Sequence, residues 1–164
     1  DQQALGYSSI PEIYYSFDLN AEYKGLGVYA LFQGIGNVSV QANTPSVYHP
    51  LFGNRTLSKE YYDNRWTADR PNARYPRLTS TVNNYANNSL WTQNGAFLKL
   101  RTLELYYKPG KHWLKPLKYV SDAKVYVRAY DLFSLDHIKI MDPENMKAGH
   151  PSMSRFAIGF DLKF

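Results

Sequence analysis

Strict alternation of apolar and polar residues constrains the fold of this chain more than any other feature of its sequence. Residues 13–24 read IYYSFDLNAEYK, and throughout this segment an apolar or aromatic side chain stands at every second position. Successive side chains of a β-strand point to opposite faces of the sheet, so an extended strand would sort these residues into one apolar and one polar face. The segment therefore predicts a two-faced β-strand.

Four further segments are predicted as strands. The last of them, RFAIGFDLKF, alternates as strictly as the first. The third changes phase near Arg101 and Thr102, as one extra residue in a β-bulge would make it do. Gly25 and Leu26 are predicted to form the tight reversal between the first two strands. The complete set of predicted strands is 13–24, 27–36, 96–108, 122–133 and 155–164.

The connections between these strands are very unequal in length. The turn at 25–26 and the connector 109–121 are short, whereas 37–94 and 134–152 are long, and the only helix predicted in the longest stretch is at 58–66. A loop of that size counts against a compact soluble domain. Short turns on one side and long loops on the other are typical of outer-membrane barrels, and the order of the strands reproduces this pattern. We therefore expect both long connections outside the cell and both short ones in the periplasm.

Aromatic residues are abundant although the chain as a whole is polar. There are 15 Tyr, 8 Phe and 3 Trp, against a mean hydropathy of −0.49. This combination fits strands with one apolar face better than a compact helical core. The sequence has no run of about 18 apolar residues, which excludes a transmembrane helix but not a transmembrane barrel, whose strands need only about ten alternating residues.

Charge and cysteine content exclude several other classes. The net charge of +5 comes from singly scattered Lys and Arg, so we expect a solvated surface of mixed charge and no nucleic-acid partner. The absence of Cys excludes disulfides, thiolate metal sites and a Cys nucleophile. No N-terminal segment has the zones of a signal peptide, so for an exported protein we expect the sequence to be a piece of a longer chain.

Motifs of catalysis or cofactor binding are almost absent. The four histidines, His49, His112, His137 and His150, are dispersed and form no metal-binding pair, so we expect no metal site. Asp142 and Glu144 flank a proline in a turn, where a solvated loop is the default and a calcium contact the weaker alternative. We expect neither a cofactor nor an enzymatic activity.

Aromatic side chains in the longest loop are the candidates for substrate or partner contact. They are Tyr61, Tyr62, Trp66 and Trp91. Such rings could stack on sugars or peptides. They could equally pack the loop against itself or against a partner, and the sequence leaves both alternatives open.

A series of short motifs resembles, in its order along the chain, the C-terminal part of SusC/RagA-type TonB-dependent transporters. The motifs are YKGLGVYALFQG at 23–34, YPRL at 75–78, NSLWTQNGAFLKLRTLELYYK at 88–108, VYVRAYDLF at 125–133, DPE at 142–144 and GFDLKF at 159–164. The resemblance covers nearly the whole chain. It implies a plug-filled barrel of about 22 strands in the cell outer membrane.

The resemblance also implies a function and partners. Transporters of this family import large nutrients such as oligosaccharides or peptides, act with a SusD-like surface lipoprotein, and take energy through TonB. In that family the plug and the TonB-binding segment lie in the N-terminal part, which we expect to lie outside residues 1–164.

The final strand resembles the C-terminal assembly signal of outer-membrane proteins. Its apolar face carries Phe156, Ile158, Phe160, Leu162 and Phe164. An exposed strand edge offers unpaired backbone groups for templated pairing, which is what the barrel-assembly machinery would recognise. The alternative is that Phe164 only anchors the barrel in an aromatic girdle at the membrane interface.

These observations predict an all-β fold. Residues 1–164 are interpreted as the C-terminal portion of an antiparallel transmembrane β-barrel, with about five strands facing outer-membrane lipid and two long extracellular loops. So few strands cannot close a barrel by themselves. The alternative is a soluble or secreted β-rich carbohydrate-binding module, in which a second sheet would cover the apolar face.

Overall fold

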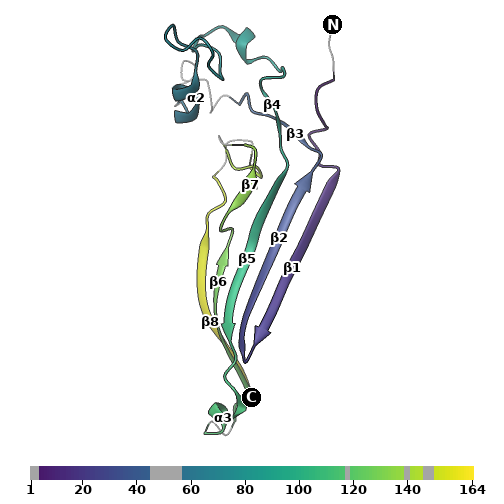
Figure 1. Cartoon of the computed structure of the whole chain (residues 1–164), viewed down its shortest axis with the longest axis vertical. Coiled ribbons are helices and arrows are strands. Elements are labelled where there is room, and N and C mark those ends of the chain that lie inside the picture. The colour runs from purple at the N-terminus through teal and green to yellow at the C-terminus, as the bar shows by residue number, and fades with distance from the viewer. Residues whose placement is uncertain (1–3, 45–56, 117–118, 139–140, 146–149) are drawn as a thin grey trace. The chain divides into compact units, whose positions relative to one another are not determined.

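A long antiparallel sheet is the main element of the structure, which is a computed structural model describing residues 4–44, 57–116, 119–138, 141–145 and 150–164 (Figure 1). The chain divides into two units. Unit 1 comprises residues 1–13, 35–97 and 136–152, and unit 2 comprises residues 14–34, 98–135 and 153–164. Each unit is described separately below.

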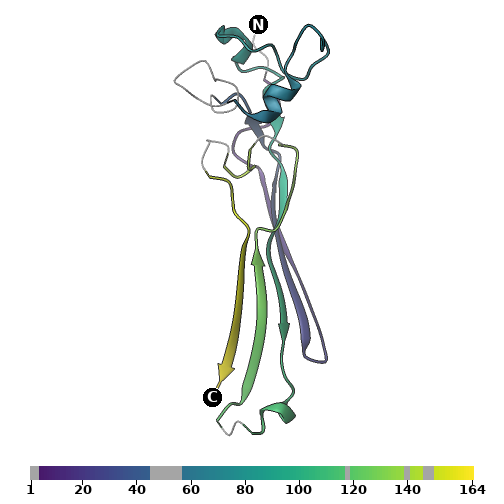
Figure 2. The same cartoon turned by 90° about the vertical axis from the view of Figure 1, so that its left-hand side faces the viewer.

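Unit 2 contains nearly all of the sheet. Its strands lie side by side in the order β1-β2-β5-β6-β8, and the short β7 also pairs with β5 (Figures 1 and 2). Their bounds are β1 Ile13–Tyr23, β2 Leu26–Gly36, β5 Phe97–Tyr107, β6 Asp122–Tyr130, β7 Ser134–Asp136 and β8 Arg155–Lys163. The five predicted strands are confirmed. The predicted strand 122–133 differs in that it ends at Tyr130 and is followed by β7.

The reversal between β1 and β2 is one residue earlier than predicted. Lys24 and Gly25 have φ values of 50° and 83°. Positive φ at both central residues suits the right-handed twist of a two-residue hairpin, and glycine adopts it without strain. The Lys108 N–H donates to the Gly25 C=O at 2.7 Å, so the β1–β2 turn and the end of β5 lie at the same end of the sheet.

The predicted change of phase in β5 is confirmed at Leu100 and Arg101. The C=O groups of these two consecutive residues accept hydrogen bonds from the same neighbouring segment, from Leu132 N–H at 3.3 Å and Asp131 N–H at 3.1 Å. In a regular strand consecutive residues bond to opposite sides, so the ladder contains a bulge here. Asp131 on the neighbouring segment has a φ of 51°, so both paired segments depart from regular strand geometry here.

The connector between β5 and β6 contains a short helix that the sequence did not predict. This helix, α3, spans Lys111–Leu114 and buries Leu114. A segment of four residues is too short to display a helical period, and the flanking prolines of the connector indicated only a break.

Unit 1 contains short elements built around an aromatic core. The helix α2, Lys59–Asn64, confirms the predicted helix, and its first turn is capped by Ser58, whose side chain accepts from the Tyr61 N–H at 3.2 Å. The sequence did not predict the other elements, β3 Ser39–Gln41, β4 Thr92–Asn94 and the 3-10 helix η1 Val82–Tyr85. The strands β3 and β4 pair with each other in antiparallel fashion.

The buried cluster of unit 1 consists of Ala42, Tyr61, Tyr75, Tyr85 and Trp91. Its rings stack, with the Tyr61 and Tyr75 centroids 5.2 Å apart and those of Tyr75 and Trp91 5.8 Å apart. Offset aromatic stacking and the burial of large rings stabilise such a cluster. Over the described residues, the helices are all too short or too polar to cross a bilayer.

Candidate functional site

The sheet of unit 2 has one apolar face formed by cross-strand pairs. Val125 lies opposite Phe160 and Val127 lies opposite Ile158 in the β6–β8 register. On the other side of β6, Leu105 lies opposite Val127. Residues directly opposite each other on one face are in side-chain contact, so these pairs form a continuous apolar surface across three strands.

This apolar face is exposed in the described chain. Ile158 is 81% exposed and Phe160 is 71% exposed. Contiguous apolar surface on this scale marks a contact with lipid or with another protein layer. On β1, Phe17 stacks on Phe32 of β2 with ring centroids 4.8 Å apart. These two strands lie at the edge of the sheet opposite β8.

The opposite face carries a charged network centred on Glu104. Lys124 Nζ lies 2.5 Å from Glu104 Oε1, and Arg128 Nε donates to Glu104 Oε2 at 2.6 Å. A second nitrogen of Arg128 pairs with the same carboxylate oxygen. Glu104 is only 5% exposed. Two cations thus hold one buried carboxylate, so the charge of Glu104 is compensated and the three side chains together carry one net positive charge.

Tyrosine rings alternate with these cations along the polar face. Arg128 lies over the Tyr126 ring at 4.7 Å, and Lys124 lies over the Tyr106 ring at 4.8 Å. Cations near the face of an aromatic ring are attracted by its quadrupole. Glycine makes room for the rings: a Cβ at Gly159 would lie 2.5 Å from Tyr126, and one at Gly27 would lie 2.1 Å from Tyr106.

The network continues to β1. Glu22 accepts from the Tyr106 hydroxyl at 2.9 Å and from Lys108 Nζ at 2.7 Å. This places Glu22 on the polar face, in agreement with the alternation predicted for 13–24. The sequence identified this face but not the partners, because partners on different strands depend on the register of pairing.

The two faces have different chemical capacities. The apolar face suits contact with lipid or with apolar protein surface. The polar face carries charged and hydroxyl groups, which need water or polar protein groups as neighbours. Paired and hydrogen-bonded side chains of this kind form a binding or lining surface.

The structure places two of the four candidate loop aromatics inside unit 1. Tyr61 and Trp91 are fully buried in the aromatic core. Burial raises the pKa of Tyr61 far above its ordinary value, and the hydrogen bond with Tyr85 adds to this shift. The Trp91 indole N–H donates to the Asn84 C=O at 2.9 Å. In this conformation both rings pack the loop against itself and are not available to a ligand.

The other two candidates are exposed. Tyr62 is 54% exposed, and the Arg65 guanidinium lies 3.8 Å over its ring. Trp66 is 42% exposed and borders a cavity. The sequence could not separate these two residues from Tyr61 and Trp91, because the whole stretch lacks a periodicity that would assign faces.

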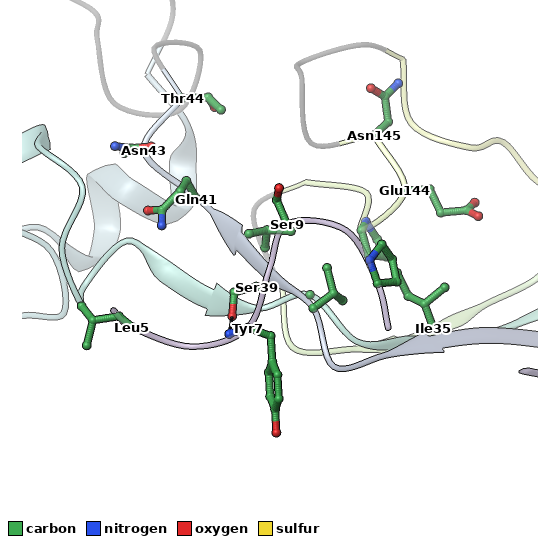
Figure 3. Close-up of a pocket in the computed structure, with 15 residues that line it drawn as sticks. Leu5, Tyr7, Ser9, Ile35, Ser39, Gln41, Asn43, Thr44, Glu144 and Asn145 are labelled. Carbon is green, nitrogen blue, oxygen red and sulfur yellow. Dashed lines mark hydrogen bonds between the residues drawn. The ribbon is translucent and has the colours of Figure 1, made fainter. Parts of the chain in front are cut away.

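Unit 1 also contains a groove, larger than the cavity beside Trp66, that the sequence did not predict. It has a volume of about 740 Å³, and Figure 3 shows its lining side chains arriving from three separate segments of the chain. Ser39 Oγ accepts from the Tyr7 N–H at 2.8 Å and fixes one wall. The lining is largely small, polar or apolar, with Glu144 as its acidic residue.

Potential metal ligands do not gather within the described ranges, where no group of three His, Cys, Asp or Glu side chains comes together. Asp142 instead accepts backbone N–H bonds from Glu144 at 3.0 Å and Ser152 at 2.6 Å. His49 lies outside the described residues. The expectation of no metal and no cofactor stays a prediction.

No family model matches the chain, but it is similar to one curated protein over almost all of its length. It is 26% identical to TonB-dependent receptor P26 of Formosa agariphila over 162 residues, which make up 98% of this chain and 16% of the receptor. The chain therefore spans a small part of that receptor.

Solved structures of a peptide importer have the same fold over this region. The RagAB peptide importer in its open-open state matches with a TM-score of 0.72 and 26% identity, covering 96% of this chain and 18% of the importer chain. The closed-closed state matches with a TM-score of 0.73 and 25% identity over 98% of this chain and 18% of the other. The predicted all-β class is confirmed as a mostly antiparallel sheet that matches part of the importer. Receptors and importers of this kind are not enzymes, as expected.

Proposed function

We propose that this chain, which is homologous over nearly its whole length to TonB-dependent receptor P26 and to the RagAB peptide importer, is one sector of the β-barrel of an outer-membrane importer. The observation that carries this proposal is the two-faced sheet of β5, β6 and β8. Its apolar pairs suit lipid on one side and its Glu104 network suits a polar interior on the other.

Energetics assign the two faces. An Arg or Lys on the lipid side of a transmembrane barrel costs about 2–4 kcal/mol at the bilayer midplane. Lys124 and Arg128 both lie on the Glu104 side of the sheet, so that side faces the lumen. The pairs Val125–Phe160 and Val127–Ile158 then face the hydrocarbon.

Closure of the barrel requires more strands than this sequence supplies. Barrels close with about eight strands or more, and plugged transporters of this type have about 22. We propose that the five long strands described here are adjacent strands of such a barrel and that each crosses the outer membrane. We further propose that residues 1–164 form the C-terminal portion of the barrel.

Peptides are the proposed cargo. The RagAB structures are those of a peptide importer, and the shared sequence covers the region that includes both long connections of this chain. By the same comparison we propose a SusD-like surface lipoprotein as partner and TonB as the source of energy. Oligosaccharides, the other substrate class expected from the sequence, become an alternative outcome of the test.

The soluble carbohydrate-binding module fits the fold less well. A sandwich would cover the apolar face of the sheet with a second sheet. Every strand described in unit 2 belongs to a single sheet, and the apolar residues of β8 remain exposed.

Uptake in cells tests the proposal. The full-length protein and its surface partner would be expressed in a host that lacks peptide importers of this type, and uptake of fluorescent peptides would be measured. We expect uptake that requires both the protein and TonB. Uptake of oligosaccharides but not peptides would contradict the proposed cargo, and no TonB-dependent uptake of either would contradict the function.

A further inference from the structure

A second cavity of unit 1 lies beside the exposed Trp66. This Trp66 pocket has a volume of about 430 Å³ and is lined by Trp66, Ala73, Arg74, Tyr75, Pro76, Arg77 and Leu90. Its side chains are apolar surfaces or hydrogen-bond donors, apart from the Tyr75 hydroxyl, which is buried. The lining has no carboxylate and no side-chain amide.

Two backbone hydrogen bonds build the pocket. The Trp66 N–H donates to the Tyr75 C=O at 2.8 Å, and the Tyr75 N–H donates to the Asn64 C=O at 3.0 Å. The Tyr75 ring is anchored in the aromatic core, since it is almost fully buried. The exposed Arg74 and Arg77 therefore extend from a segment that is fixed both by its backbone and by its neighbour.

Positive charge around this pocket is poorly compensated. Residues 65–77 contain four arginines and one acid, Asp69. Arg65 and Arg70 donate to the backbone C=O groups of Tyr62 and Asp63, which are neutral acceptors. Arg74 lies 3.8 Å from the Glu60 carboxylate, a loose and exposed pair.

Arg77 is an exposed arginine that lines the pocket. Within the part of the chain that the structure describes, no carboxylate lies within 4.0 Å of it. A guanidinium presents a planar fork of donors that matches a carboxylate with two parallel hydrogen bonds. The Trp66 ring and Leu90 provide apolar surface within the same cavity.

We propose that the Trp66 pocket binds a carboxylate of the transported peptide through Arg77, with Arg74 adding charge, so that the importer prefers acidic peptides. The inference rests on the proposed peptide import. A peptide fits better than an acidic sugar, because the carboxylate of Asp or Glu is carried on apolar methylene groups that match the Trp66 ring and Leu90. The methylenes and backbone beside the carboxylate pack on Trp66 and Leu90.

Paired peptides test the preference. The full-length importer, purified with its surface partner, would be titrated with two peptides of equal length, one with Asp and Glu and one with Asn and Gln at the same positions. We expect about fivefold tighter binding of the acidic peptide, which is what an exposed ion pair provides, and a loss of this ratio at higher salt. In Arg77→Gln the ratio of the two affinities is expected to fall to about one.

Arg70→Gln is the matched control. It removes the same charge from the same loop, but Arg70 does not line the pocket, so the preference is expected to persist. Arg77→Lys keeps the charge without the fork and is expected to give an intermediate ratio.

Three results would overturn the assignment. The first is an acidic preference that survives Arg77→Gln, and the second is an equal loss in Arg70→Gln, which would indicate a diffuse field and not a site. The third is that acidic and amide peptides bind equally well, while polygalacturonate competes with them and loses this competition in Arg77→Gln. That result would indicate that the pocket binds an acidic sugar. Absence of binding for both peptides would instead contradict peptide import itself, and the pocket assignment with it.

Discussion

Gly159 and Tyr126 illustrate how single residues set the polar face of the sheet. They lie opposite each other in the β6–β8 register, and the Tyr126 ring covers the glycine. Gly159→Ala would place a Cβ 2.5 Å from ring atoms, so the ring must shift from its position 4.7 Å from the Arg128 guanidinium. We expect a loss of about 1–3 kcal/mol in the free energy of unfolding, measured for the full-length barrel in lipid vesicles.

Tyr126→Ala provides the control for this prediction. Without the ring, the added methyl group meets no obstacle, so Gly159→Ala in the Tyr126→Ala background is expected to cost little. Equal costs in both backgrounds would show that the glycine is needed for some reason other than the ring.

At the residue scale the sequence predicted faces but not partners. Alternation placed Glu22 on the polar side correctly, and it grouped the apolar residues of β8 on one face. The pairing of Glu104 with Lys124 and Arg128 depends on register, which local sequence does not specify. Likewise, nothing local separates the buried Tyr61 from its exposed neighbour Tyr62, because only tertiary packing in unit 1 distinguishes them.

At the element scale the long strands were predictable and the short elements were not. Each long strand has enough residues to display a period of two. β3 and β4 have three residues each, and their pairing joins Ser39 to Asn94 across the longest loop. Such non-local pairing leaves no periodic trace in the sequence.

The sidedness of the connections is a prediction at this scale. The β1–β2 turn and the end of β5 share one end of the sheet, and the long connections follow the other ends of β2 and β6. Cysteine would replace the exposed Tyr62 and Lys111 in separate variants. An impermeant thiol reagent is expected to label position 62 on intact cells, and position 111 only after the outer membrane is permeabilised.

The sequence described here contains no cysteine that would complicate this labelling. Labelling of position 111 but not of position 62 on intact cells would invert the proposed topology.

At the scale of the whole molecule, the apolar series of β8 is proposed as a signal for barrel assembly. The series consists of four residues of β8 and the residue that follows it, all exposed: Phe156, Ile158, Phe160, Leu162 and Phe164. Phe164→Asp would place a carboxylate where an apolar ring is expected at the membrane interface. We expect slower insertion of the full-length barrel, measured as the fraction that becomes heat-modifiable after a pulse of synthesis.

Phe164→Leu serves as the matched variant, since it keeps an apolar side chain and is expected to assemble faster than the Asp variant. Normal assembly kinetics in Phe164→Asp, followed by lower stability, would indicate that Phe164 only anchors the finished barrel.

The central claim is that the sheet separates lipid from a polar lumen, and adjacent residues of β8 test it most directly. Ile158 lies on the apolar face opposite Val127, and Ala157 lies on the polar face opposite Arg128. Spin labels on cysteines at these two positions, in the full-length protein reconstituted in lipid, would report collisions with oxygen and with a water-soluble nickel chelate. The account predicts that the label at 158 collides mainly with oxygen and the label at 157 mainly with the nickel chelate. A reversed pattern, or a label at 158 that neither reagent reaches because protein covers it, would contradict the account.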